Sequence, residues 1–123
     1  MDFDPLSNRV LGCALEVHKA LGPGLLESAY ESALAYELST AGLMAQRQVD
    51  VPVVYKKAKL DCGFRIDLLV EKQLVVELKS VESLLPLHEA QLLTYLKLTG
   101  CKVGLLINFN VRLLKNGIKR LVL

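Results

Sequence analysis

Apolar residues recur at helical spacing in the first third of the chain. Asp4 and Pro5 predict the start of a helix, because Asp caps helix N-termini and Pro fits the first helical position. The stripe that follows consists of Leu6, Val10, Ala14, Val17 and Leu21. Gly22-Pro23-Gly24 then breaks the chain, and a second apolar pattern predicts a helix over residues 25–41.

Strand patterns dominate the rest of the chain, with one more helix among them. The expected elements are, in order, a strand over 44–55, a hairpin over 63–81, a helix over 87–99, and strands over 102–109 and 118–123. Pro52 places the first strand at a sheet edge or a bulge, and Lys115-Asn116-Gly117 is the last turn. This order predicts one α/β (α+β-like) domain over residues 1–123. A three-stranded antiparallel meander would feed a crossover helix and further strands of a mixed sheet.

The hairpin over residues 63–81 contains three charged residues among apolar neighbours: Asp67, Glu77 and Lys79. Strands this apolar are usually covered on both faces, so these charges should be largely desolvated. Removing an ion from water costs roughly several kcal/mol unless a partner or a metal compensates for it. The pattern therefore indicates a functional site.

The length of the hairpin loop decides whether the two acids can meet. A three-residue loop, Glu71-Lys72-Gln73, pairs Val70 with Leu74 and sets Asp67 opposite Glu77. A two-residue loop would send the two carboxylates to opposite faces of the sheet. The site hypothesis therefore requires an odd loop.

Composition narrows the classes of protein without choosing a function. A chain of 123 residues with 52% apolar and 23% charged residues is typical of one folded domain. The net charge of +2 neither demands nor excludes nucleic acid, so any basic footprint must be local. No signal peptide or membrane span is visible, which favours a cytoplasmic location. Three widely spaced cysteines, Cys13, Cys62 and Cys101, are expected to be reduced, buried and inert.

The charged residues of the hairpin suit one kind of chemistry. Asp67, Glu77 and the intervening backbone carbonyl of Leu78 are the oxygen ligands that Mg²⁺ or Mn²⁺ would take. Lys79 would position the attacking water or hold a phosphate, and Gln91 and Tyr95 share a helix face that adds polar groups. No Ser-His-Asp set, glycine-rich phosphate loop or Cys/His cluster competes with this hypothesis.

Other polar residues have ordinary structural explanations. Glu27 suits the first turn of a helix, where an acid complements the dipole, and His18 fits a half-buried position near a helix end. The basic segment Lys56-Lys57-Ala58-Lys59 is either a solvated turn or a phosphate contact.

Taken together, these motifs resemble the PD-(D/E)xK nuclease superfamily: Asp67, then Glu77-Leu78-Lys79, then Gln91-x-x-x-Tyr95. The Gln-x-x-x-Tyr pair resembles the branch of recombination exonucleases and Cas4-like enzymes. The segment Gly24-Leu25-Leu26-Glu27-Ser28-Ala29-Tyr30 matches the motif of the GxxExxY family of small prokaryotic proteins. Ile66 stands where the superfamily pattern has Pro, a departure that many members share.

The resemblance implies a restriction-endonuclease-like core and a nuclease that uses Mg²⁺ or Mn²⁺ on DNA or RNA. It promotes Glu27 to a third metal-binding carboxylate. It also makes His18 and Tyr30 pocket residues, and we assign them with Arg65 as candidate substrate contacts.

Two alternatives stay open at this stage. The chain could be a non-catalytic module that binds nucleic acid or assembles with a protein partner, including a second copy of itself. The charged residues could also be a buried ion network, in which Lys79 and Arg65 neutralise the two acids.

Overall fold

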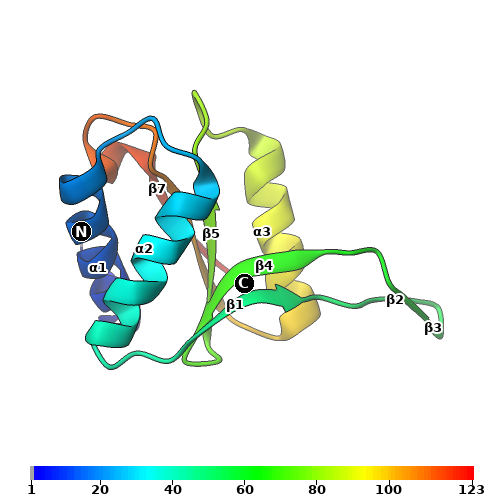
Figure 1. The fold of residues 1–123 in the computed structure, drawn as a ribbon. Coiled ribbons are helices and arrows are strands. Elements are labelled where there is room, and N and C mark those ends of the chain that lie inside the picture. The colour runs from blue at the N-terminus through cyan, green and yellow to red at the C-terminus, as the bar shows by residue number, and fades with distance from the viewer. Residues whose placement is uncertain (1) are drawn as a thin grey trace.

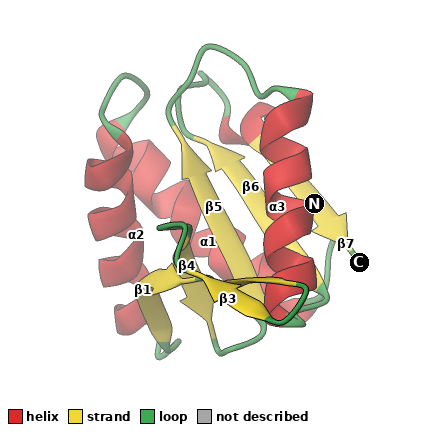
Figure 2. Cartoon of the chain, turned by 90° about the vertical axis from the view of Figure 1, so that its right-hand side faces the viewer, coloured by secondary structure: helices red, strands yellow, loops and turns green. Residues whose placement is uncertain are grey.

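The computed structural model describes residues 2–123 and arranges them in three layers (Figure 1). A five-stranded sheet is the middle layer. Helices α1 (Pro5–Leu21) and α2 (Glu27–Thr40) cover one face, and α3 (Pro86–Thr99) covers the other (Figure 2). No helix in this range is long and apolar enough to cross a membrane.

The sheet is mixed, as the order of elements predicted. Its strands, in spatial order, are β1 (Ala45–Asp50), β4 (Arg65–Val70), β5 (Leu74–Lys79), β6 (Val103–Asn108) and β7 (Ile118–Val122). Strands β5 and β6 are parallel and α3 crosses between them, whereas the other neighbours are antiparallel. The predicted meander, crossover helix and further strands are therefore confirmed.

The strand expected over residues 44–55 is wrong in its second half. The chain leaves the sheet after β1, which is an edge strand, and Pro52 lies at the break. Pro has no N–H to donate to a sheet ladder, so the pairing with β4 ends there. The next residues form β2 (Val53–Tyr55), which pairs with β3 (Ala58–Leu60) in a separate two-stranded sheet.

The loop between β4 and β5 has three residues, as the site hypothesis requires. Val70 pairs with Leu74 across the hairpin, and Leu68 pairs with Val76. Glu71 and Lys72 take up positive φ angles of 53° and 55°, which turn the chain back in the direction of the strand twist. The register places Asp67 and Glu77 next to each other at the point where the ladder ends.

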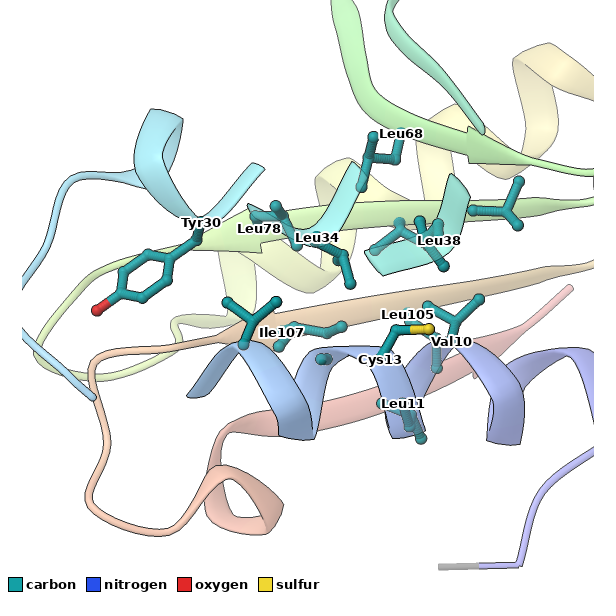
Figure 3. Packing of buried hydrophobic residues seen from close by; sticks show 14 of the residues in the cluster. Val10, Leu11, Cys13, Tyr30, Leu34, Leu38, Leu68, Leu78, Leu105 and Ile107 are labelled. Carbon is teal, nitrogen blue, oxygen red and sulfur yellow. The ribbon is translucent and has the colours of Figure 1, made fainter. Parts of the chain in front are cut away.

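Two apolar clusters hold the layers together. The larger cluster joins α1 and α2 to the sheet, and Figure 3 shows its helix residues Val10, Leu34 and Leu38 against the strands. The smaller one packs Leu92 and Leu96 of α3 against the other face. The predicted stripe of the first helix is largely confirmed, although Leu21 at its end is exposed.

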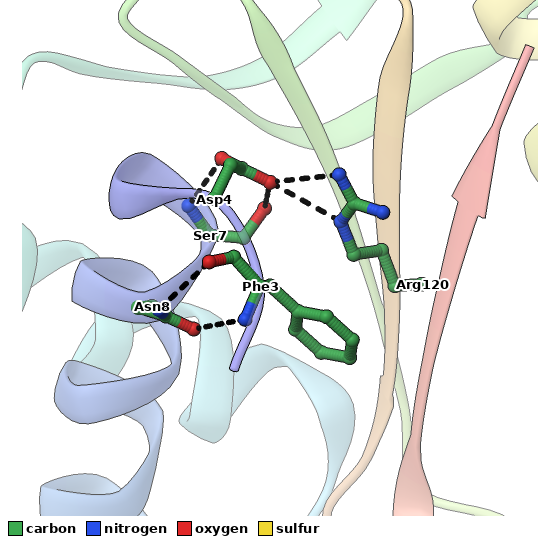
Figure 4. A network of polar contacts seen from close by, with 5 residues as sticks. All are labelled: Phe3, Asp4, Ser7, Asn8 and Arg120. Atoms are coloured by element: carbon green, nitrogen blue, oxygen red, sulfur yellow. Dashed lines mark hydrogen bonds and ion pairs between the residues drawn. The ribbon is translucent and has the colours of Figure 1, made fainter. Parts of the chain in front are cut away.

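The predicted cap at Asp4 also ties the N-terminus of the first helix to the last strand (Figure 4). The Asp4 carboxylate accepts hydrogen bonds from the Ser7 backbone N–H at 3.0 Å and from Arg120 Nη2 at 3.0 Å. Burial alone would raise the pKa of Asp4, but the hydrogen bonds from Ser7 and Arg120 outweigh it and lower the pKa to about 2. Residues 116 positions apart are thereby joined.

The cysteines follow the expectation in two of three positions. All three are free, and Cys13 and Cys101 are buried, but Cys62 is exposed. Cys62 lies in the connection between β3 and β4, outside both sheets, which explains why the expected burial is wrong there.

Gly117 is required by a close approach of two backbone segments. A Cβ atom at this position would lie 2.2 Å from the Asn108 carbonyl oxygen, so the backbone would have to move. Gly117→Ala is expected to lower the free energy of unfolding by about 2–4 kcal/mol, measured by urea denaturation. Gly12→Ala is the control, since a Cβ there meets nothing within 4 Å. A Gly117→Ala protein as stable as the wild type would contradict this packing.

Candidate active site

Asp67 and Glu77 face each other where β4 and β5 separate. The Asp67 backbone N–H donates to Glu77 Oε1 at 3.1 Å, and the Leu78 backbone N–H donates to Asp67 Oδ2 at 2.8 Å. Each carboxylate is thus oriented by the backbone of the other strand. The hairpin therefore fixes two acids at one point by its register alone.

This pair carries more negative charge than its surroundings neutralise. Burial raises the pKa of Asp67, and Glu77 is only 5% exposed. Burial first and the Asp67 charge second raise the pKa of Glu77 to about 8, and the charge of Lys79 opposes this only as a minor cause. At neutral pH the metal-free pair therefore retains a proton, which a cation would displace.

A buried ion network does not account for the pair. In the described part of the chain, four ion pairs occur, and none of them includes Asp67, Glu77 or Lys79. Arg65, the proposed second cation, instead donates from Nε to Asp50 Oδ1 at 3.0 Å on the exposed surface. Arg65 therefore does not act as a second cation that neutralises Asp67 and Glu77.

An acidic cleft opens beside the pair on the side of α2. It has a volume of about 400 Å³ and is lined by Glu27, Ser28, Glu31, Gln48 and Asp67. Glu27 Oε1 accepts a long hydrogen bond of 3.4 Å from the Ser80 backbone N–H, which follows β5 directly. Three carboxylates from α2 and β4 therefore line one concave surface.

Sequence reasoning missed two members of this cleft, Glu31 and Gln48. Glu31 is 8% exposed and accepts from Arg47 Nη2 at 3.0 Å. The Gln48 side-chain amide bridges Glu31 Oε1 and Asp67 Oδ1, the latter at 3.4 Å. The four-residue spacing from Glu27 could have indicated Glu31, but only the register of β1 on β4 brings Gln48 opposite Asp67.

A second cleft, of about 450 Å³, lies along α3 and has different chemistry. We call it the α3 cleft; it is lined by Lys79, Leu87, His88, Ala90, Gln91 and Thr94. It contains no carboxylate, and Lys79 supplies its positive charge. The His88 Nδ1 atom accepts from the Leu85 backbone N–H at 3.0 Å, so a neutral ring carries its proton on Nε2.

Tyr95 links the α3 cleft to the acids. Its side chain is 4% exposed, and burial followed by the charges of Glu77 and Asp67 raises the pKa of its hydroxyl. The Gln91 side chain opposes this increase in the pKa as a minor cause. The two polar residues of the third helix therefore lie together beside the carboxylates.

Tyr30 lies in the interior and His18 is half-buried in the last turn of α1, as predicted for it, and neither lines either cleft. Tyr30 is fully buried, stacks on Phe109 at 4.5 Å, and donates from its hydroxyl to the Gly22 carbonyl at 2.6 Å. His18 Nε2 lies 2.7 Å from the Val111 carbonyl oxygen. The Tyr30 hydroxyl thereby holds the loop before α2, where Glu27 lies, and His18 holds the segment after β6; neither contact brings the side chain into a cleft.

Asn108 is a further residue that the sequence left unassigned. Although it is only 1% exposed, its amide makes three hydrogen bonds. Its Oδ1 accepts from the Val81 backbone N–H at 3.1 Å and from the Asn110 backbone N–H at 3.2 Å, and its Nδ2 donates to the Val81 carbonyl at 2.9 Å. It thereby fixes the segment that follows Lys79.

The oxygen donors fit a hard divalent cation, although a complete ligand set is not grouped in advance. Among residues 2–123, no three Asp, Glu, His or Cys side chains are arranged to hold a metal ion. The buried Asp67–Glu77 pair, with its surplus negative charge, is the part that fits a cation. Glu27 lines the same cleft as Asp67 but does not complete a three-ligand group.

Comparison with known proteins gives one result. A family model described as the PD-(D/E)XK nuclease superfamily matches residues 4–121. No curated protein and no solved structure matches the chain.

Proposed function

The chain belongs to the PD-(D/E)XK nuclease superfamily, and on that premise we propose that it is a divalent-metal-dependent nuclease that hydrolyses phosphodiester bonds of DNA or RNA. The observation that carries the proposal is the meeting of Asp67 and the buried Glu77 where β4 and β5 separate, with each carboxylate held by a backbone N–H of the other strand. Within the superfamily, the Gly24 to Tyr30 motif supports the GxxExxY family. Gln91 and Tyr95 support the Cas4-like branch.

Asp67, Glu77 and the Leu78 carbonyl are the proposed ligands of Mg²⁺ or Mn²⁺. Glu27 is the proposed further carboxylate, because it lines the cleft of Asp67 and holds only one long hydrogen bond. When bound, such an ion lowers the pKa of water and offsets the charge that develops on a phosphate. Gln48 and Glu31 keep Asp67 turned towards this position through the amide bridge.

We infer that the metal and the phosphodiester bind in different clefts, on the two sides of the acid pair. The acidic cleft repels a phosphate and attracts a cation. Lys79 and the His88 Nε2–H face the α3 cleft, where they would bind a phosphodiester. Lys79 also lies two residues after Glu77, so its ammonium group can position the attacking water. Gln91 and Tyr95 support this arrangement from α3.

The test is cleavage of labelled single-stranded DNA, duplex DNA and RNA by the purified protein. We expect product with Mg²⁺ or Mn²⁺ and none with EDTA, because two acids without a cation repel the phosphate. Cleavage that persists equally in EDTA would contradict metal dependence. EDTA added to a reaction that already contains the metal should stop cleavage completely.

A non-catalytic module that binds nucleic acid or a protein partner is the second candidate. It is favoured by the lack of a grouped three-ligand set among residues 2–123. Metal titration that neither raises the melting temperature nor yields cleavage, with binding of nucleic acid intact, would support it over the nuclease. Light scattering with and without DNA measures whether a dimer forms.

A further inference from the structure

The small sheet of β2 and β3 forms an arm, defined here as residues 53–60, that projects from the body of the molecule. Figure 1 shows it extending beyond α3, and Figure 2 shows it crossing in front of the main sheet. Its two strands pair with each other and lie outside the five-stranded sheet. All its residues from Val54 to Leu60 are exposed.

The arm holds a concentrated positive charge. Lys56, Lys57 and Lys59 lie in and beside its turn, and residues 53–60 contain no acid. The chain as a whole has a net charge of +2, so the residues outside the arm sum to −1 (+2 minus +3). The Lys56 ammonium lies 5.5 Å from the centre of the Tyr55 ring, and Tyr55 is 53% exposed. With so small a net charge any basic footprint must be local, and residues 53–60 are a local concentration of positive charge.

The arm is joined directly to strands that carry the acidic cleft. It connects β1, which carries Gln48, to β4, which carries Asp67. Lys57 lies ten positions before Asp67, and an extended chain of ten residues spans at most ~36 Å. A duplex rises roughly 3.4 Å per base pair, so the arm lies within about ten base pairs of the acids along a bound nucleic acid.

We propose that the arm binds the sugar–phosphate backbone of the nucleic-acid substrate, a surface that extends the grip of the protein beyond its two clefts. The inference rests on the proposed function, whose substrate it helps to hold. An isolated two-stranded hairpin is at best marginally stable in water, so a partner that orders it is expected. The arm itself holds three lysines and no acid, which matches a polyanion; Asp50 and Asp61, beyond its two ends, line a cleft with Lys59, so Lys56 and Lys57 at the turn carry most of the contact. The exposed Tyr55 ring offers a stacking surface for a base.

The test is a triple variant, Lys56→Ala, Lys57→Ala and Lys59→Ala. Its affinity for a 20-base-pair duplex and for a single strand of equal length is measured by fluorescence anisotropy, with Ca²⁺ in place of Mg²⁺, over a range of KCl concentrations. We expect at least roughly 10-fold weaker binding of the preferred form at 100 mM salt, and a salt slope that is smaller by about 3.

A control variant removes the same charge elsewhere. Lys72, Lys97 and Lys102 are exposed. Lys72 and Lys102 lie just before the parallel strands β5 and β6, and therefore at the opposite end of these strands from Glu77 and Lys79, which end β5. Replacing these three by Ala is expected to change the affinity less than 3-fold. Melting temperatures of both variants verify that they fold.

The possible outcomes distinguish binding of nucleic acid by the arm from the proposed nuclease activity. Equal affinity of the arm variant and the wild type, or no binding by the wild type, overturns the inference, and cleavage by the wild type still decides the nuclease. Arm-dependent binding without any cleavage supports the inference and overturns the proposed function. A dimer that dissociates in the arm variant, with affinity unchanged, overturns the inference in favour of a second copy as the partner.

Discussion

Asp67→Ala is expected to lower the rate of metal-dependent cleavage about 1,000-fold or more, which corresponds to a loss of ~4 kcal/mol of transition-state stabilisation. The Asp67 carboxylate is proposed to hold the metal and is oriented by the Leu78 N–H at 2.8 Å. Without it, Glu77 is the one carboxylate left at the hairpin, beside the Leu78 carbonyl and Glu27, so both cation binding and polarisation of the bound water weaken. The measurement is the initial rate on the best substrate at saturating Mg²⁺.

The matched control is Glu16→Ala, which removes an exposed acid of α1. Its rate should remain within about 2-fold of the wild type, because surface changes rarely alter a distant site. If Asp67→Ala retained full activity, or if Glu16→Ala lost as much, the assignment of the active site would be wrong. The melting temperature of each variant in EDTA separates loss of chemistry from loss of folding.

Glu77→Gln is expected to stabilise the metal-free protein at pH 8 to 9. The pKa of Glu77 is about 8 in the folded state against 4.5 as its ordinary value, so the folded state binds the proton more tightly. Its contribution to stability is therefore fully present below pH 4.5 and is lost as pH rises through 8. A pKa difference of this size corresponds to roughly 3–5 kcal/mol of free energy of unfolding. The neutral amide does not lose this stabilisation as pH rises, so the variant should be the more stable protein above pH 8.

Urea denaturation in EDTA at pH 5, 7 and 9 measures this effect. The wild type should lose stability across the series, and Glu77→Gln should lose much less. Glu16→Gln is the control, since that side chain is exposed and should leave the pH dependence of the wild type intact. A wild-type stability that does not fall from pH 5 to pH 9 would contradict the surplus negative charge at the pair.

Local signals in the sequence predicted most of the main sheet and its helices. The cap at Asp4 with Pro5 and the odd loop between β4 and β5 both depend on neighbours in sequence, and both occur in the structure as predicted. The arm was not predicted: β2 continues the alternation of β1 with only Pro52 between them, and Ala58 and Lys59, expected in a basic turn, instead begin β3.

Only the part of the site that lies on a single hairpin was predictable from the sequence. Asp67 and Glu77 meet through the register of adjacent strands, which counting residues can establish. Gln48 reaches Asp67 from the edge strand, and no pattern in the sequence fixes that pairing. For Tyr30, by contrast, a polar residue that the resemblance made a pocket residue is fully buried and holds a loop through its hydroxyl.

The most direct test of the central claim is the position of Mn²⁺ in crystals soaked at pH 8, located by anomalous diffraction. At that pH a large fraction of the Glu77 carboxyl groups is ionised, because the pKa of Glu77 is about 8. We expect one ion within about 2.0–2.3 Å of carboxylate oxygens of Asp67 and Glu77 and of the Leu78 carbonyl. An ion bound only elsewhere, or no ion beside the pair at saturating Mn²⁺, would contradict the assignment of a metal-dependent nuclease.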